Sequence, residues 1–209
     1  MTVQASDLWE PYYDQVTETC LVKYKQADEI DPLDLLTTLM HLEGLPMHCP
    51  VHHYIMPALF LTAVRKKQGH QVEVLERDLV ETEKRARNIL PGFCGFYGAC
   101  GAAVGLGVFF SIITDATPYS PGNPWAWANK ATGQALLDIS EMGGPRCCKR
   151  TSYRAFQTGL AQIENNLGIS FNVPQKIICT QHELNAECLR LACPYYPVEE
   201  NVEKAECQR

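Results

Sequence analysis

Hydrophobic residues recur at intervals of three and four along most of the first 168 residues, which is the spacing of one face of an α-helix. Start and stop signals divide the pattern: Asp31 and Pro32 open one segment and Gly44 ends it. We assign no element to the acidic residues 1–30. The pattern predicts helices over residues 31–44, 51–69, 72–90, 125–142 and 145–168.

The pattern changes after residue 168. Residues 171–181, FNVPQKIICTQ, are typical of a short strand, and residues 182–197 of a short helix that a proline ends. The sequence therefore predicts a mainly α fold, with a helical bundle over residues 1–168 that contains a glycine-rich central helix. A small cysteine-bearing strand-helix appendage is expected over residues 169–209.

Composition and charge limit the function classes. A chain of 209 residues with 46% hydrophobic and 20% charged residues can bury one substantial core. A net charge of -6 gives no broad attraction to phosphate backbones or anionic lipid, which disfavours nucleic acid as the main partner. The N-terminal residues lack a basic region followed by an apolar one, and no apolar run reaches about 18 residues. We expect a cytoplasmic protein without a membrane partner.

Ten cysteines in a reducing compartment indicate metal, cluster or sulfur chemistry rather than a disulfide framework. Two of them lie in the glycine-rich segment PGFCGFYGACGAAVGLGVFFS, residues 91–111. Each glycine inside a helix costs about 0.5 to 1 kcal/mol relative to alanine, so this density needs compensation. Close helix packing is one explanation, and close approach of the backbone to a bulky inorganic group is the other. The residues that would contact such a group are Cys94, Gly95, Gly98, Cys100 and Gly101.

The segment GGPRCCKR places two vicinal cysteines at a predicted helix start. Free N–H groups and the helix dipole stabilise an anion there, so Cys147 and Cys148 are expected to have lowered thiol pKa values. Arg146, Lys149 and Arg150 are candidates for holding the carboxylate or phosphate of a substrate. The simpler alternative is a helix start whose basic residues face solvent.

Histidines cluster around Pro50. His48 and His52 are four residues apart and could form a metal-binding pair on one helix face, although Pro50 interrupts that face. Alternatively, His52 or His53 moves a proton in a reaction, with Cys49 beside them as a candidate metal ligand.

Three further cysteines, Cys179, Cys188 and Cys193, lie in the predicted appendage. With a fourth ligand such as His182 they could bind zinc, and they could also be three ligands of an iron-sulfur cluster. They are therefore a candidate second metal site.

The motifs HxxxHH, GFCGxYGxCGAAxGxG, GGPRCCKR and CPYYP together resemble an uncharacterised cysteine-rich family of anaerobic prokaryotes, which implies no activity. Residues 90–155 more weakly resemble the oxygen-sensitive iron-sulfur L-cysteine desulfidases and L-serine dehydratases. The shared order is a CGAA-type glycine-rich helix, a helix with Asn129, a glycine pair and a cysteine beside basic residues. This chain is much shorter and lacks the acidic, glycine-containing stretch that those enzymes place between two cysteines.

The second resemblance implies a [4Fe-4S] cluster on three cysteines, with an open iron that acts as a Lewis acid. Cys100 and either Cys147 or Cys148 would be ligands, with Cys94 or Cys49 as the third. We therefore expect a lyase that eliminates or desulfurates a small anionic substrate bearing sulfur or hydroxyl. In that reaction His52 or His53 would move the proton and the arginines would bind the carboxylate.

Two alternatives come from other classes of protein. A sulfur or metal carrier would take up persulfide on Cys147 or Cys148 and pass it to a protein partner. A zinc-stabilised binding module would use Cys179, Cys188 and Cys193 as structural ligands and would carry out no chemistry.

Overall fold

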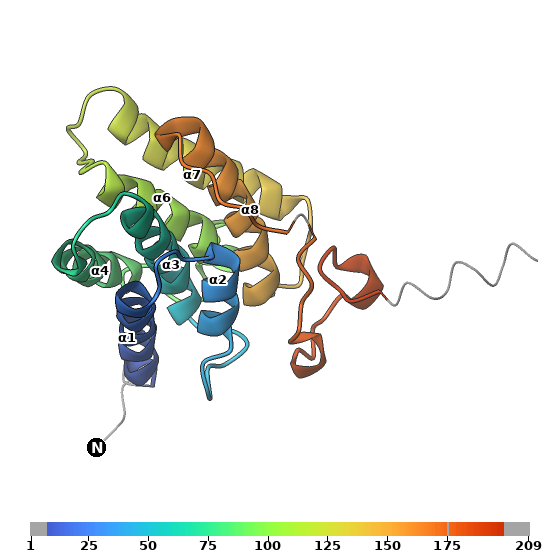
Figure 1. Cartoon of the computed structure of the whole chain (residues 1–209). Helices are drawn as coiled ribbons and strands as arrows, with labels where there is room; N and C mark the ends of the chain where they lie inside the picture. The colour runs from blue at the N-terminus through green and yellow to red at the C-terminus, as the bar shows by residue number, and fades with distance from the viewer. Residues whose placement is uncertain (1–7, 175, 199–209) are drawn as a thin grey trace, which may run out of the picture.

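The computed structural model describes residues 8–174 and 176–198, and this part of the chain forms a bundle of α-helices followed by an irregular segment (Figure 1). The helices are α1 (Glu10–Gln26), α2 (Pro32–Met40), α3 (Val51–Lys67), α4 (Val72–Ala86), α5 (Phe93–Phe96), α6 (Gly101–Ile113), α7 (Asn123–Ser140) and α8 (Cys148–Leu167). Two short 3-10 turns, η1 (His182–Leu184) and η2 (Arg190–Ala192), follow. The predicted mainly α bundle is confirmed.

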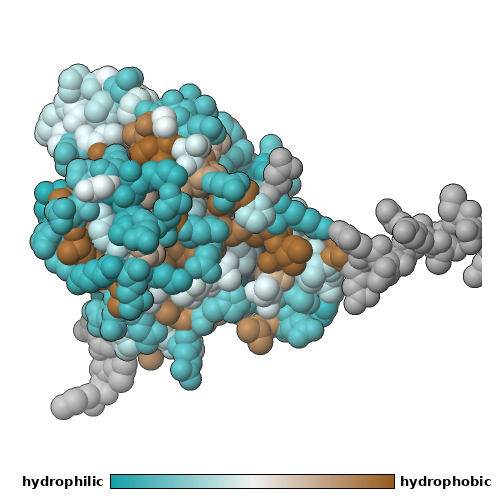
Figure 2. Space-filling view, in the orientation of Figure 1, coloured by the Kyte–Doolittle hydropathy of each residue, from teal (hydrophilic) through white to brown (hydrophobic). Residues whose placement is uncertain are grey.

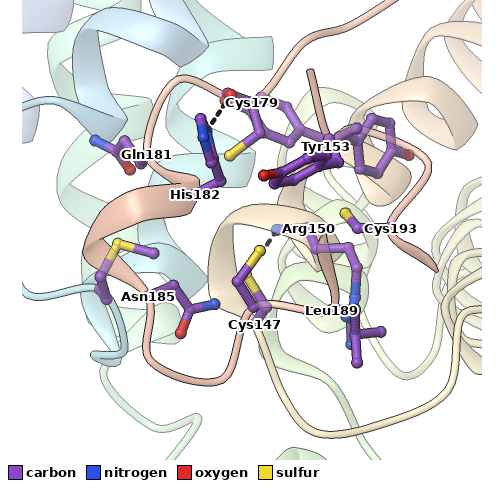
Figure 3. A pocket seen from close by; sticks show the side chains of 13 residues that line it. Cys147, Arg150, Tyr153, Cys179, Gln181, His182, Asn185, Leu189 and Cys193 are labelled. Atoms are coloured by element: carbon purple, nitrogen blue, oxygen red, sulfur yellow. Dashed lines mark hydrogen bonds between the residues drawn. The ribbon is translucent and has the colours of Figure 1, made fainter. Parts of the chain in front are cut away.

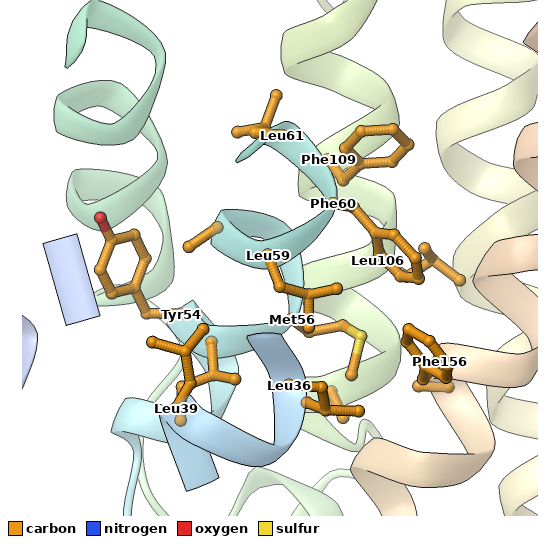
Figure 4. Packing of buried hydrophobic residues seen from close by; sticks show 14 of the residues in the cluster. Leu36, Leu39, Tyr54, Met56, Leu59, Phe60, Leu61, Leu106, Phe109 and Phe156 are labelled. Atoms are coloured by element: carbon orange, nitrogen blue, oxygen red, sulfur yellow. The ribbon is translucent and has the colours of Figure 1, made fainter. Parts of the chain in front are cut away.

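Helix α3 forms the centre of the bundle. Fourteen of its 17 residues are buried, and it packs against α1, α2, α4, α6 and α8. A helix that is apolar on nearly all sides is expected to be surrounded in this way. Phe60 of α3 stacks on Phe156 of α8 and packs beside Phe109 of α6, with ring centroids 5.5 and 5.6 Å away (Figure 4).

The glycines of α6 allow close helix packing, which was the simpler of the two explanations for them. A Cβ atom on Gly105 would lie 2.6 Å from the carbonyl oxygen of His53 in α3. A Cβ atom on Gly107 would lie 2.0 Å from Oγ1 of Thr132 in α7. Since real Cβ atoms do not approach so closely, α6 packs against both helices only because these positions lack a side chain.

Helix α1 lies where the sequence analysis assigned no element. Its buried residues are Tyr13, Val16, Cys20 and Tyr24, which follow one another at intervals of three and four. That stripe is a helical signal, but it is narrow and the residues between its members are polar. The signal was therefore present in the sequence and we missed it.

The predicted strand over residues 171–181 is wrong. The described residues of this segment form no strand, and Cys179 donates its backbone N–H to the carbonyl of Tyr195 at 2.7 Å without a continuing ladder. The predicted helix over residues 182–197 is replaced by η1 and η2. Asn185 interrupts it, because its side-chain oxygen accepts the N–H of Glu187 and competes with helical bonding.

The irregular segment packs against α2 and α8. Gln181 donates from Nε2 to the carbonyl oxygen of Met40 at 2.7 Å, and the Tyr195 hydroxyl donates to Gln157 at 2.7 Å. The Tyr195 ring also lies 5.2 Å from the ring of Tyr153. We call residues 169–198 of the described chain the C-terminal segment. Residues 1–7 and 199–209, which belong to the two predicted regions, lie outside the described residues.

The described helices include none that is long and apolar enough to cross a membrane. The face drawn in Figure 2 is mostly hydrophilic, with apolar residues in separate patches.

Candidate functional site

The first turns of three helices meet at one small cavity, which we call the chamber. Helices α3, α6 and α8 all contribute residues from their N-terminal turns, and the chamber has a volume of about 30 Å³. Its lining residues are His52, His53, Cys94, Cys100, Gly101, Ala102, Arg146, Cys147, Cys148, Thr151 and Ser152. Helix N-termini present free N–H groups and a partial positive charge, so three of them favour a negatively charged occupant.

The cysteines of the chamber occupy the ends of the helices. Cys100 is the N-cap of α6, and Cys148 is the first residue of α8. Cys147 is the N-cap of α8, and its sulfur accepts the backbone N–H of Arg150 at 3.5 Å. Cys94 comes from the short helix α5. The chamber thus brings together four of the five cysteines that were predicted as ligands.

His52 faces the chamber with one nitrogen unpartnered. Its Nδ1 lies 3.1 Å from the carbonyl oxygen of Cys49, and a carbonyl can only accept, so Nδ1 carries the proton. Nε2 of His52 is buried and has no hydrogen-bond partner. Burial, together with the nearby charge of Lys149, holds the pKa of His52 well below its usual range. The ring is therefore neutral at pH 7, with a free lone pair on Nε2.

Ser152 and His53 complete the polar lining. The Ser152 hydroxyl is fully buried and also has no partner in the described chain. His53 places Nδ1 2.8 Å from the carbonyl oxygen of Ile89, and burial lowers its pKa. Its ring lies against Gly101, where a Cβ atom would come within 2.4 Å of Nε2. Unpaired buried polar atoms are rare, so Nε2 of His52 and the Ser152 hydroxyl indicate an occupant.

The predicted lowering of the thiol pKa at Cys148 is wrong. Burial raises the pKa of Cys148 to about 12, and the neighbouring thiols of Cys49, Cys100 and Cys147 raise it further. Burial also raises the pKa values of Cys49 and Cys100. The cost of removing a thiolate from water therefore exceeds the benefit of the helix N-terminus. These thiols are protonated at neutral pH unless a metal displaces their protons.

An open hollow adjoins the chamber and shares four of its residues. The hollow has a volume of about 620 Å³, and the shared residues are Cys94, Cys100, Arg146 and Thr151. Gly95 and Gly98 also line the hollow, and a Cβ atom on either would meet nothing within 4 Å. These two glycines therefore lie beside open space, whereas Gly101 packs against a histidine ring. The hollow is large enough for a small organic substrate.

The three basic residues of the RCCKR segment are in different environments. Arg146 is exposed on the hollow. Lys149 is 1% exposed, and its Nζ donates to the carbonyl oxygen of Met40 at 2.7 Å. Arg150 is 3% exposed and donates from Nη2 to the carbonyls of Gly143 and Pro145, with Nε unpartnered.

These placements correct the predicted anion site. Lys149 lines neither the chamber nor the hollow, so it cannot contact a substrate there. No carboxylate in the described chain lies within salt-bridge distance of Lys149 or Arg150. Buried cations normally have an anionic partner, so these two indicate that negative charge is present nearby in the working protein. Burial lowers the pKa of Lys149 to about 8.

A second cavity, which we call the thiol pocket, lies between α8 and the C-terminal segment (Figure 3). It has a volume of about 20 Å³, and its lining includes Cys147, Cys179, Cys188 and Cys193. Figure 3 shows Cys147, Cys179 and Cys193 on different sides of this space. The three cysteines of the predicted second site therefore line one cavity with Cys147. His182 lines it as well, with Nδ1 3.3 Å from the carbonyl oxygen of Cys179.

The vicinal cysteines lie between the two cavities. Of the two cavities, Cys148 lines only the chamber, whereas Cys147 lines both the chamber and the thiol pocket. Cys49 lines neither cavity, and its sulfur lies 3.3 Å from Nδ1 of His52. His48 does not form the predicted metal pair with His52: its Nε2 lies 2.9 Å from a carboxylate oxygen of Glu187. Within residues 8–174 and 176–198, no three His, Cys, Asp or Glu side chains are already placed to hold a metal ion.

Sequence reasoning missed three contributors to this region. Ser152 carried no motif, and only the structure shows that its hydroxyl has no partner. Lys149 was predicted to hold a substrate anion, so its contribution as a buried charge beside the thiols was missed. Thr151, which lines both the chamber and the hollow, follows from its position one helical turn after Cys147 and Cys148.

Comparison with known proteins gives a family and no activity. No curated protein and no solved structure matches the chain, so the resemblance to L-cysteine desulfidases and L-serine dehydratases stays a prediction. Residues 17–196 match a family of unknown function (DUF5714), and this range includes the chamber, the hollow and the thiol pocket. The chain therefore belongs to the DUF5714 family.

Proposed function

We propose that this protein is an iron-sulfur enzyme, a lyase that eliminates or desulfurates a small anionic substrate at the chamber. The observation that carries the proposal is the pair of buried, unpartnered atoms in the chamber, Nε2 of His52 and the Ser152 hydroxyl. They lie among thiols at three helix N-termini, where an anionic group is favoured.

The thiols of the chamber are donors of the kind that hold a [4Fe-4S] cluster, and the chamber of about 30 Å³ would have to widen to take one. Cys94, Cys100 and Cys148 would be its ligands, and three thiolates leave one iron without a protein ligand. Such an iron, when bound, supplies a Lewis acid for a leaving group. The helix N-termini and Lys149 would stabilise the negative charge of the thiolate-bound group. Because the thiols are protonated without metal, loading would release protons and would be more favourable at higher pH.

The protein's own residues would bind the substrate and move its proton. Arg146, exposed on the hollow, would bind the substrate carboxylate through a charge-assisted pair. Nε2 of His52 would accept the proton from the carbon adjacent to the one that bears the leaving group. The electrons of that C–H bond would form the new carbon-carbon double bond, and the leaving group would depart with the electrons of its C–S or C–O bond. No external oxidant or reductant is required, since the products are hydrogen sulfide or water and an alkene. From L-cysteine or L-serine this alkene is an enamine, which tautomerises to an imine and takes up water to give pyruvate and ammonia.

A sulfur carrier that acts through Cys147 or Cys148 has less support. A carrier thiol must reach a partner protein, whereas Cys147 is buried and burial raises the pKa of Cys148 to about 12. The enzyme proposal uses the buried Cys148 as a cluster ligand.

The proposal is tested by anaerobic assays of sulfide and pyruvate release, with L-cysteine and L-serine as probe substrates. Purified protein should turn over at least one of them, and His52→Gln should lose at least about a hundredfold in kcat while it retains iron. His41→Gln, which changes an exposed histidine away from the chamber, is the matched control. Turnover that is unaffected by His52→Gln, or that persists in iron-free protein, would contradict the proposal.

A further inference from the structure

The thiol pocket joins four cysteines that are far apart in sequence. Cys147 caps α8, and Cys179, Cys188 and Cys193 belong to the C-terminal segment. The pocket is small and enclosed, and all four cysteines line it. Figure 3 shows Cys179 and Cys193 of the segment on other sides of this space than Cys147 of the bundle. Four thiols around one small space form the donor set of a tetrahedral zinc site.

Two of the four sulfurs also accept a backbone N–H from two or three residues further along the chain. The Cys147 sulfur lies 3.5 Å from the N–H nitrogen of Arg150, and the Cys188 sulfur lies 3.4 Å from that of Arg190. Hydrogen bonds to sulfur stabilise the thiolate form, which is the form that binds metal. One of these two sulfurs belongs to the bundle and the other to the C-terminal segment.

The local charge favours an anionic metal-thiolate group. Arg150 lines the pocket, is 3% exposed and has no carboxylate partner in the described chain. A zinc ion with four thiolates carries a net charge of -2, and Arg150 together with Lys149 would offset it.

The C-terminal segment also needs stabilisation that its own structure does not supply. From residue 169 onward, the described chain contains only η1 and η2 as regular structure, and its core residues are few: Ile177, Cys179 and Tyr195. Short segments without a core of their own are usually held by a metal or a disulfide. All described cysteines of this chain are free thiols, so a metal is the candidate.

We propose that Cys147, Cys179, Cys188 and Cys193 bind one Zn²⁺ that fastens the C-terminal segment to the start of α8. Binding replaces four S–H bonds by four Zn–S bonds and releases four protons to solvent, with no change in oxidation state. The thiols must move toward the centre of the pocket, because Zn–S bonds are about 2.3 Å long. This site has a closed ligand set and therefore a structural role, separate from the chamber.

Cys148→Ser and Cys188→Ser form a matched pair for the test. Protein purified anaerobically is analysed for zinc and iron per chain by mass spectrometry. Wild type should contain about one zinc per chain, Cys188→Ser should lose at least about four fifths of it, and Cys148→Ser should retain it. Cys148→Ser should lose iron, whereas Cys188→Ser should retain it. Zinc below about 0.2 per chain in wild type after growth with added zinc would overturn the proposal, as would full zinc in Cys188→Ser.

Cobalt reconstitution of the wild-type chain covers the case in which Cys188→Ser does not fold. Wild type loaded with Co²⁺ should show the intense visible and sulfur-to-metal charge-transfer bands of a tetrahedral four-thiolate site. Zinc should displace the cobalt, and these bands should disappear. Zinc should also slow tryptic cleavage after Arg190, which is exposed in the C-terminal segment. Iron and sulfide in place of zinc, or a cobalt spectrum without thiolate bands, would overturn the proposal.

Discussion

Nδ1 of His52 lies 3.1 Å from the carbonyl oxygen of Cys49, and this hydrogen bond leaves Nε2 as the ring nitrogen without a partner. The carbonyl favours the proton on Nδ1, so the neutral ring of this chamber-lining residue keeps a free lone pair on the buried Nε2. Metal-ligating and proton-accepting histidines are commonly held in this way by a carbonyl behind them. Through this hydrogen bond, the backbone just before α3 sets the protonation state of a histidine that lines the chamber.

Acid should destabilise the metal-free protein through His52. The folded-state pKa of His52 is lowered, so as pH falls through about 6.5 the unfolded chain takes up the proton before the folded chain does. Stability should fall by up to about 1.4 kcal/mol per pH unit for this residue, and His53 should add to the effect in the same direction.

Urea unfolding of the metal-free protein between pH 7.5 and pH 5.5 measures this effect. His52→Gln should have a clearly shallower decline in the free energy of unfolding, whereas His41→Gln should follow wild type. Equal slopes in all three proteins would show that Nε2 of His52 is not buried without a partner.

Lys149→Met should separate stability from metal binding. The Met40 carbonyl still accepts from Gln181 in the variant, so removing the buried charge should leave the unfolding free energy of metal-free protein unchanged or raise it by about 1 kcal/mol. Metal content should fall severalfold, because the thiolate groups lose a nearby positive charge. Lys66→Met is the matched control, since Lys66 also donates to a backbone carbonyl, that of Tyr24, outside both cavities.

The dependence of the unfolding free energy on pH tests the burial of Lys149 independently. Its folded-state pKa of about 8 lies below the unfolded value, so the contribution of Lys149 to the stability of metal-free protein should rise as pH increases from about 8 toward 10.5. The buried thiols, whose pKa values are raised, act in the opposite direction over this range. Lys149→Met should lack this rise, which chemical denaturation at pH 7.5 and pH 9.5 would detect. A rise of the same size in the variant would contradict the burial of a charged lysine.

Gly107→Ala should destabilise the bundle, whereas Gly95→Ala should not. A Cβ atom at Gly107 would meet Thr132 at 2.0 Å and the carbonyl of Ala128 at 3.0 Å, so α6 and α7 would have to separate. We expect a loss of about 2 to 3 kcal/mol in the free energy of unfolding by urea titration. Gly95 has open space around it, and its variant should stay within about 0.5 kcal/mol of wild type.

Arg146→Gln should weaken substrate binding without affecting the metals. Its side chain lies on the hollow, and loss of a charge-assisted hydrogen bond of about 1.5 to 3 kcal/mol should raise KM for the active probe about tenfold or more. Steady-state kinetics should show a smaller change in kcat. Lys130→Gln, an exposed change on α7, should behave as wild type, and an unchanged KM in Arg146→Gln would remove this residue from the proposed binding site.

The helices whose ends carry a strong local signal could be predicted from the sequence. Asp31 accepts the N–H groups of Leu33 and Asp34 and starts α2 as expected, and Gly168 ends α8 in a left-handed conformation. The C-terminal segment could not be predicted in this way, because its conformation depends on contacts with α2 and α8. Hydrogen bonds such as that from Gln181 to Met40 join residues 141 positions apart.

The sequence could predict which cysteines are candidate ligands, but it could not predict which of them line the same cavity. The sequence predicted one role for either Cys147 or Cys148, and it placed Cys188 in a separate site. In the structure both residues line the chamber, but only Cys147, which precedes α8 in an extended conformation, also lines the thiol pocket. Through-space grouping of this kind depends on how α3, α6, α8 and the C-terminal segment pack, and no local pattern encodes it.

The amounts of iron and acid-labile sulfide per chain test most directly whether the chamber holds a cluster on Cys94, Cys100 and Cys148. Anaerobically purified or reconstituted wild type should contain about four iron atoms and four sulfides per chain, and Cys148→Ser should contain less than about half of each. Cys20→Ala, which alters a buried core cysteine away from both cavities, should match wild type. Wild type without iron and sulfide after reconstitution, or Cys148→Ser with full amounts of both, would contradict the account.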